Sequence, residues 1–214
     1  MTLKPPIAYE IFNNNEAKLE CKMTGQDQTA LNKIQITWQI DGRTVTDNIS
    51  ETTNSGDKTS TLTRSRTEWQ SVNNVRCSAN SDNTTPVTRD LTIHKADGVE
   101  PKVTVHILPE EDTNTGDSAE VTLVCLVSSS VQQDYFIGWL EYSGEKVSTY
   151  NDGNNFLPLK TKDGFSVTSI YKTSKEKWNK YDMFSCNVWA AGSKRLMKSR
   201  NVSKGLSNST ECKK

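Results

Sequence analysis

Apolar and polar residues alternate along short stretches of the first half of the chain. In residues 17–23 the odd positions are apolar or cysteine, whereas positions 18, 20 and 22 are charged. Residues 34–40 (Ile-Gln-Ile-Thr-Trp-Gln-Ile) repeat this alternation, and Asp41-Gly42 then marks a turn between two strands. A period of two is typical of a β-strand with one face in the core and the other in water.

The second half has the same kind of stretches but a different balance of residues. Residues 121–127 (Val-Thr-Leu-Val-Cys-Leu-Val) are apolar or nearly so on both faces of the predicted strand. Residues 136–140 and 184–188 predict two further core strands, and residues 175–178 (Lys-Glu-Lys-Trp) predict a short helical or turn connection. The two halves therefore predict strands of similar length but with unlike outer faces.

One cysteine–tryptophan spacing occurs twice in the chain. The two copies are Cys21, Trp38, Trp69, Cys77 and Cys125, Trp139, Trp178, Cys186. In immunoglobulin-type sandwiches one disulfide joins two facing sheets, and a tryptophan from a neighbouring strand packs on it. The repeat predicts an all-β chain of two tandem sandwiches, each with one inter-sheet disulfide and with Trp38 or Trp139 in its core. Cys212 is the fifth cysteine and has no partner in this pattern.

Length and composition divide the chain into two domains and a tail. With 214 residues, the chain is long enough for two domains of about 100 residues. We expect domains at residues 1–97 and 98–200, joined by a short linker at residues 95–101 that is punctuated by Gly98 and Pro101. Residues 201–214 are polar and predict an exposed tail.

Charge and sequence motifs indicate a secreted, extracellular protein. Lys+Arg and Asp+Glu number 26 each, so the sequence has no basic footprint for nucleic acid, and no apolar run is long enough to span a bilayer. Paired cysteines are typical of oxidising compartments. Four N-glycosylation sequons agree with such a compartment, and they begin at Asn48, Asn83, Asn201 and Asn208.

The motifs of the second half resemble the last constant domain of antibody heavy chains. They are Thr122-Leu-Val-Cys125-Leu-Val127, Trp139, Trp178 and Phe184-Ser-Cys186-Asn-Val188. The Asn201-Val-Ser203 sequon followed by Cys212 is similar to the secretory tailpiece of polymeric antibodies. The resemblance implies two immunoglobulin constant-type domains of an Fc region plus a tailpiece. The divergent sequence suggests a bony-fish heavy chain of the T/Z or M class.

The resemblance also implies partners and sites. In that family the tailpiece asparagine is glycosylated, and a cysteine such as Cys212 links monomers into polymers. The expected partners are further heavy chains and an Fc receptor or polymeric immunoglobulin receptor. Trp189 follows Val188 on an alternating strand, so we expect it to point outward. By resemblance it is a candidate receptor contact, and the competing interpretation is that it packs against the linker side of the first domain.

The outer faces of the two cysteine strands predict different roles for the two domains. Lys18, Glu20, Lys22 and Thr24 face outward in the first, and Thr122, Val124 and Leu126 face outward in the second. Burying apolar groups is favourable, whereas burying unmatched charges is costly. We therefore expect the second domain to pair with its own copy as a C2 homodimer. By resemblance the neighbouring strand adds Thr168, Ile170 and Lys172 to this interface. Scattered surface residues are the alternative interpretation of Val124 and Leu126.

No residue pattern predicts catalysis, a cofactor or a metal site. The only histidines are His94 and His106, no Cys-x-x-Cys occurs, and no glycine-rich phosphate loop is present. The second hypothesis for function is a pair of membrane-proximal immunoglobulin-like domains from a cell-surface adhesion or antigen receptor. The polar tail and the apolar outer face of the second domain favour the antibody interpretation, and a secreted enzyme subunit is a much weaker third.

Overall fold

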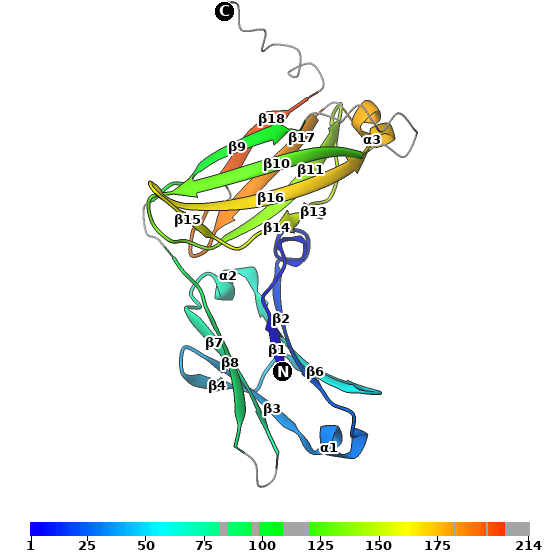
Figure 1. Ribbon diagram of the computed structural model, residues 1–214, viewed down its shortest axis with the longest axis vertical. Coiled ribbons are helices and arrows are strands. Elements are labelled where there is room, and N and C mark those ends of the chain that lie inside the picture. The colour runs from blue at the N-terminus through cyan, green and yellow to red at the C-terminus, as the bar shows by residue number, and fades with distance from the viewer. Residues whose placement is uncertain (82–84, 96–98, 109–119, 182, 196, 204–214) are drawn as a thin grey trace, which may run out of the picture. The chain divides into compact units, whose positions relative to one another are not determined.

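The chain divides into two compact units, Met1–His94 and Lys95–Lys214. The computed structural model in Figure 1 describes residues 1–81, 85–95, 99–108, 120–181, 183–195 and 197–203, and for 197–200 it describes the backbone alone. The division falls at the start of the stretch that composition marks as a linker, three residues before the expected boundary.

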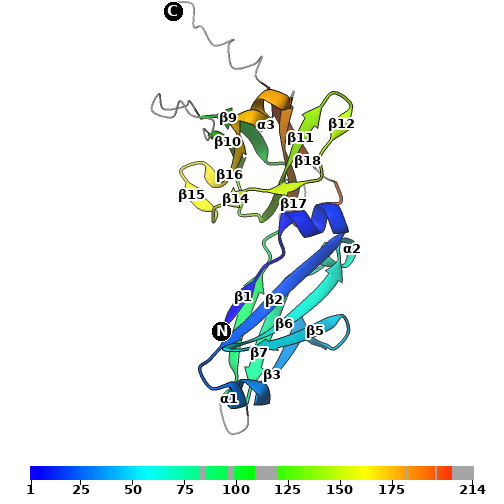
Figure 2. The same cartoon turned by 90° about the vertical axis from the view of Figure 1, so that its right-hand side faces the viewer.

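The first unit is a sandwich of two antiparallel sheets with four strands each (Figure 2). The first sheet has the order β1 (Thr2–Lys4), β2 (Glu16–Thr24), β6 (Asp57–Ser65) and β5 (Ile49–Asn54). The second sheet has the order β4 (Arg43–Val45), β3 (Gln35–Ile40), β7 (Asn74–Asn80) and β8 (Val87–Thr92). The alternating stretches at residues 17–23 and 34–40 therefore lie on strands, as expected, and the structure places these strands in opposite sheets.

Three short helical segments connect these strands, and local hydrogen bonds explain where two of them begin. They are η1 (Glu10–Asn14), α1 (Gln28–Lys33) and α2 (Arg66–Trp69). α1 is capped by Asp27, the residue before the helix, whose carboxylate accepts from the backbone N–H of Thr29 at 2.8 Å. α2 begins with a capping box, in which the Ser65 side chain and the Glu68 side chain each accept from the other's backbone N–H. The alternation pattern predicted none of these segments.

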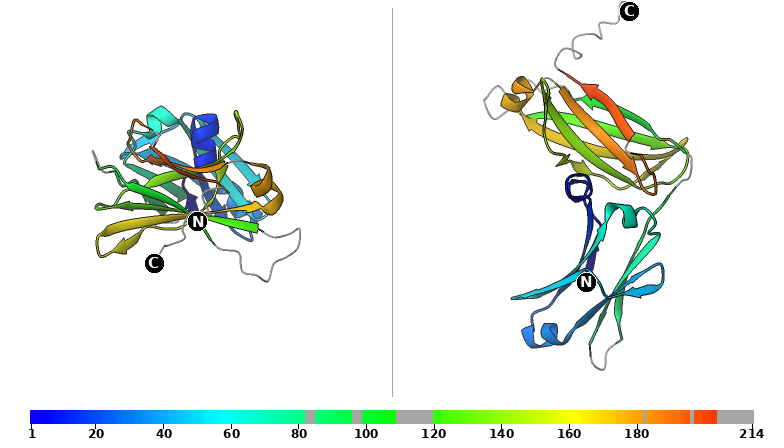
Figure 3. Two further views of the ribbon diagram at one scale, coloured as in Figure 1. Left: turned by 90° about the horizontal axis from the view of Figure 1, so that it is seen from above. Right: turned by 180° about the vertical axis from the view of Figure 1, so that it is seen from behind.

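The second unit is also a sandwich, with five strands in each sheet (Figure 3). The first sheet has the order β14 (Asn154–Asn155), β16 (Gly164–Ser174), β10 (Glu120–Ser129) and β9 (Lys102–Ile107), with β15 (Leu159–Thr161) also paired to β16. The second has the order β12 (Lys146–Val147), β11 (Tyr135–Ser143), β17 (Met183–Ala190) and β18 (Met197–Val202), with β13 (Asn151–Asp152) also paired to β11. The expected all-β fold with two sandwiches is confirmed.

Two segments of the second unit refine the sequence interpretation. Residues 175–178 lie in a helix, α3 (Lys175–Lys180), whose first turn is capped by the Ser174 hydroxyl. β18 continues through Asn201 and Val202, where Asn201 is opposite Ser185 of β17. The last strand therefore includes the first two residues of the segment that composition assigned to the tail.

Each sandwich is closed by one disulfide, and a tryptophan packs beside that disulfide in each core. Cys21 is bonded to Cys77, and Cys125 to Cys186. Trp38 and Trp139 are fully buried, and each is opposite the second cysteine of its own unit on the neighbouring strand. These contacts are the ones that the repeated spacing predicted.

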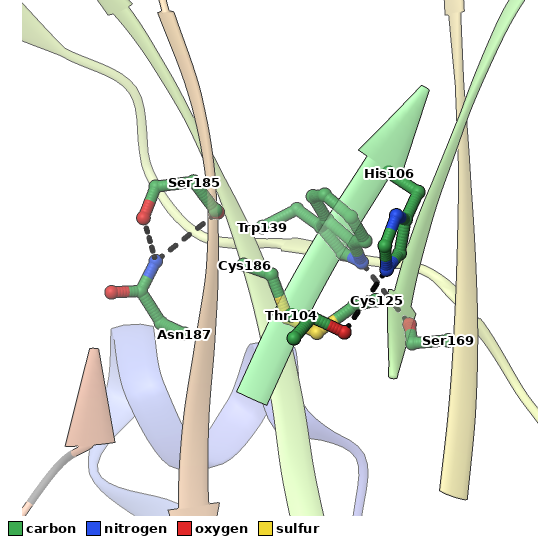
Figure 4. Close-up of a disulfide and its surroundings, with 8 residues drawn as sticks. All are labelled: Thr104, His106, Cys125, Trp139, Ser169, Ser185, Cys186 and Asn187. Carbon is green, nitrogen blue, oxygen red and sulfur yellow. Dashed lines mark hydrogen bonds between the residues drawn. A yellow bond between two sulfur atoms is a disulfide. The ribbon is translucent and has the colours of Figure 1, made fainter. Parts of the chain in front are cut away.

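Both core tryptophans also donate a hydrogen bond to a buried serine in the opposite sheet. Trp38 Nε1 lies 2.9 Å from Ser60 Oγ, and Trp139 Nε1 lies 3.1 Å from Ser169 Oγ (Figure 4). Neither serine is exposed to solvent. A buried indole N–H needs such an acceptor, so the pair links the two sheets in addition to the disulfide.

Candidate functional site

The outer face of the β9–β10–β16 sheet in the second unit is the candidate functional site. Six residues of this face were predicted from the sequence, three on β10 and three on β16. Strand register places them in direct cross-strand pairs, namely Thr122 with Lys172, Val124 with Ile170 and Leu126 with Thr168. Because cross-strand partners project from the same face of a sheet, all six side chains lie together.

Burial along β10 confirms which face points outward. Leu123, Cys125 and Val127 are fully buried in the core, whereas the residues between them, Val124 and Leu126, are only half-buried. Val124 and Leu126 therefore offer apolar surface that the chain itself leaves partly open to water.

The structure adds an exposed apolar segment to this face that sequence reasoning missed. Phe156, Leu157 and Leu159 are 55%, 89% and 68% exposed. The backbone N–H of Phe156 donates to the carbonyl of Thr168 at 2.9 Å, and Leu159 is opposite Ser166 on β16. The segment therefore continues the sheet beside Thr168. The signal in the sequence was the run Phe-Leu-Pro-Leu in otherwise polar surroundings.

The edge strand β9 contributes two further residues to the face. Thr104 is opposite Leu126, and His106 is opposite Val124. Sequence reasoning noted His106 only as one of two histidines, because its place beside Val124 depends on a register that the sequence does not reveal. We use "outer face" below for the six predicted residues together with Thr104, His106, Phe156 and Leu159.

The charged side chains at the end of the outer face are paired within the protein. Lys172 Nζ donates to Glu120 Oε2 at 2.9 Å, and both side chains are about half exposed. An exposed pair of this kind contributes only ~0–1 kcal/mol to stability. Because the Lys172 cation already has a carboxylate beside it, Lys172 would keep an ion-pair partner if another protein covered the face.

The corresponding face of the first unit is charged. Lys18, Glu20 and Lys22 alternate with buried residues of β2. Each is in an ion pair: Glu20 with Lys4 at 3.1 Å, Lys22 with Asp57 at 2.8 Å, and Lys18 with Glu10 and Glu16 at 3.1 Å. This face has neither the apolar surface nor the free charges that would favour covering it with another protein.

Hydrogen bonds in this charged cluster shift two pKa values in opposite directions. The Asn14 amide, and after it Lys18, hold the pKa of the Glu10 carboxyl below its usual range. The same contact with Glu10, followed by that with Glu16, raises the pKa of Lys18. Both groups therefore stay charged over a wider pH range than isolated side chains would.

A buried polar network supports the outer face from inside the sandwich. Tyr171 lies on β16 between the outward residues Ile170 and Lys172, and its ring stacks on Trp139 with centroids 5.3 Å apart. Its hydroxyl donates to Glu141 Oε1 at 2.7 Å, and Lys177 Nζ lies 3.6 Å from Glu141 Oε2. Burial, and then the bond to Glu141, raise the pKa of Tyr171 well above its usual range.

Comparison with known families finds a match for most of the second unit. Residues 105–193 match the family described as the immunoglobulin C1-set domain. Most of the second unit therefore resembles an immunoglobulin C1-set domain. The match covers β10, β11, β16 and β17, and every residue of the outer face except Thr104 lies within it. We call the second unit the C1-set domain below.

Two curated proteins are similar to this protein over most of its length. The C region of the Ig mu chain of Canis lupus familiaris is 26% identical over 214 residues, which amounts to 96% of this protein and 47% of that relative. The C region of the Ig alpha chain of Oryctolagus cuniculus is 24% identical over 202 residues, which amounts to 90% of this protein and 64% of that relative. The sequence thus spans roughly half to two thirds of the relatives it matches, and both are constant regions of antibody heavy chains.

The Trp189 ring is buried, although the strand period predicted that it points outward as a candidate receptor contact. The residue is 1% exposed, its ring lies 5.4 Å from that of Phe136, and its Nε1 donates to the carbonyl of Ser193 at 2.7 Å. Phe136 is opposite Trp189 on the neighbouring strand β11 of the C1-set domain. The indole therefore supports the turn between β17 and β18 through its hydrogen bond, and its ring is not exposed for contact with a receptor.

Two of the four predicted glycosylation sites lie in the described residues, and both are exposed. Asn48 directly precedes β5 and has a left-handed backbone with φ 55°, and Asn201 lies on β18. Exposure is what attachment of a glycan requires. Asn83, Asn208 and Cys212 lie outside the described residues.

The part of the sequence that the structure describes contains no arrangement that suggests metal binding. In that part, no three histidine, cysteine, aspartate or glutamate side chains are placed to hold a metal ion. Nor does any helix among the described residues have the length and apolar character needed to cross a bilayer. What the outer face can do chemically is associate, by removing apolar side chains from water.

Proposed function

We propose that the protein is part of the Fc region of a secreted antibody heavy chain, which pairs with a second copy through the outer face of the C1-set domain. The observation that carries the proposal is the half-buried Val124–Ile170 and Leu126–Thr168 pairs, with the exposed segment at Phe156 beside them. The similarity to the mu and alpha constant regions supports it.

The energetics favour pairing through this face over pairing through the first unit. Fully burying one leucine or isoleucine side chain contributes about 1.5–3 kcal/mol. A C2 dimer buries every residue of the patch twice, once from each copy. In the first unit, covering Lys18, Glu20 and Lys22 would remove their ion pairs from water, a cost that the attraction within each pair often fails to offset.

The finer proposals concern assembly, modification and receptors. Cys212 would link heavy chains into polymers, and glycans at Asn48, Asn83, Asn201 and Asn208 would cover parts of the surface. We also propose a polymeric isotype, of the bony-fish T/Z or M class, that binds an Fc receptor or polymeric immunoglobulin receptor. Because the Trp189 ring is buried, receptor contact would come through the turn that it braces. Lys194→Glu in that turn tests this without disturbing the core, since Lys194 is exposed.

The experiment that tests pairing is Val124→Arg in a Cys212→Ser background, measured by sedimentation equilibrium. Two arginines would be buried without partners in each dimer, so we expect the dissociation constant to rise at least about 100-fold. Val124 is half-buried on the outer face, so the free energy of unfolding of the separated monomer should change by less than about 0.5 kcal/mol.

Val147→Arg is the matched control. Val147 is 52% exposed on β12, which belongs to the other sheet of the same domain. This variant should remain dimeric. If Val124→Arg sediments as a dimer, or if the parent protein is a monomer at micromolar concentration, the proposed pairing is refuted and the receptor-ectodomain interpretation becomes the stronger one.

A further inference from the structure

His106 is placed on the outer face by strand register. The following inference rests on the proposed pairing of two copies through that face. His106 is exposed near the end of β9, and its Cα is paired with that of Val124, which is in turn paired with Ile170. The imidazole therefore borders the apolar centre of the face and would be covered together with it.

The imidazole has one polar contact in the described structure. Its Nε2 lies 3.1 Å from the hydroxyl of Thr104, two residues earlier on the same strand (Figure 4). A hydroxyl can donate or accept, so it can satisfy a neutral ring in either tautomer. A hydroxyl does not neutralise the charge of a protonated ring.

The charged groups on the surrounding strands offer the imidazole no free acid. β9 itself carries Lys102. The one carboxylate on β9, β10, β16 and β18 is Glu120, and its partner is Lys172 at 2.9 Å. These strands therefore place no unpaired carboxylate beside the imidazole.

We propose that His106 is a residue of the self-association face and that its protonation weakens the pairing of two copies. Covering the face takes the ring out of water, and burial penalises the charged form of a histidine but not the neutral form. Histidine is the side chain that ordinarily changes its charge between pH 5 and 8. The dimer would therefore be strongest at neutral pH and would loosen in mildly acidic surroundings.

The test is the dissociation constant of the Cys212→Ser protein, measured by sedimentation equilibrium at pH 7.5 and pH 5.5. A difference of one pKa unit between two states of any group changes an equilibrium by about tenfold, and a C2 dimer contains the group twice. We expect the dissociation constant at pH 5.5 to be about 10- to 100-fold higher. Thermal unfolding at both pH values shows whether each variant remains folded.

The second histidine supplies the control. His106→Gln keeps a polar side chain without a titrating ring, and should remain dimeric with less than about a threefold change between the two pH values. His94→Gln should keep the full pH dependence of the parent protein. Equal dissociation constants of the parent at both pH values, or a pH dependence that survives His106→Gln, would overturn this inference and leave the pairing itself intact. A monomeric parent at pH 7.5 would overturn both.

Discussion

Replacing Tyr171 with phenylalanine removes one hydroxyl from the interior of the C1-set domain. That hydroxyl donates to Glu141 Oε1 at 2.7 Å, and Glu141 is only 2% exposed. A hydrogen bond to a charged group contributes about 1.5–3 kcal/mol. The phenylalanine ring can still stack on Trp139, and Lys177 remains near the carboxylate. We therefore expect the free energy of unfolding at pH 7 to fall by about 2 kcal/mol.

The same variant has a pH signature that a simple packing defect would lack. Burial and the bond to Glu141 raise the pKa of Tyr171 in the folded state, whereas an unfolded tyrosine has a pKa of about 10. A raised folded pKa contributes stability that is complete below pH 10 and is lost as pH rises above it. The loss reaches about 1.4 kcal/mol at pH 11. Phenylalanine cannot ionise, so the cost of Tyr171→Phe should shrink by that amount between pH 7 and pH 11.

The assay is guanidinium unfolding of the full chain, followed by tryptophan fluorescence, at pH 7, 10 and 11. Leu123→Ala assigns the unfolding transition of the second unit. Because Leu123 is fully buried in that unit, this substitution lowers the guanidinium midpoint of that transition. Tyr142→Phe, on the same strand as Glu141, is the control and should cost less than about 0.5 kcal/mol at every pH. A cost for Tyr171→Phe that is below about 0.5 kcal/mol at pH 7, or that stays constant up to pH 11, would refute the reasoning.

Two further predictions concern local structure. Ser65→Ala removes the capping box of α2 and should lower the stability of the first unit by about 1 kcal/mol, measured by thermal unfolding, while Ser65→Asp should retain most of it. Gly164→Ala should lower the stability of the second unit by roughly 3 kcal/mol or more in the same assay, because Gly164 has φ 134° and a Cβ there would meet the carbonyl of Ser129. Unchanged stability in the Gly164→Ala variant would show that the turn relaxes at little cost.

The sequence predicted the features that depend on local pattern. Alternation placed the strands around Cys21 and Trp38, and the repeated cysteine–tryptophan spacing predicted both disulfides. The outward direction of Val124 followed from the inward direction of its neighbour Cys125, because successive residues of a strand point to opposite faces. Features of this kind need only the strand period and one buried reference residue.

The sequence could not predict features that depend on register or on side-chain packing between strands. The strand period predicted that Trp189 points outward, but it could not predict that the ring packs beside Phe136 on another strand and donates to the Ser193 carbonyl in the following turn. The place of His106 beside Val124 depends on which residues of β9 and β10 are opposite each other. η1 and α1 are too short for a helical period to show against the strand pattern.

The disulfides also determine how the protein responds to mechanical force. Cys21 and Cys77 are 56 residues apart, and Cys125 and Cys186 are 61 apart. An extended polypeptide spans at most about 3.3–3.6 Å per residue. When the protein is pulled at its ends, the residues between the two cysteines of each disulfide cannot extend, so each disulfide shortens the fully stretched chain by roughly 200 Å. Tension could detach β1 and β8 in one unit, or β9 and β18 in the other, but the strands inside each loop would stay joined until the disulfide is reduced.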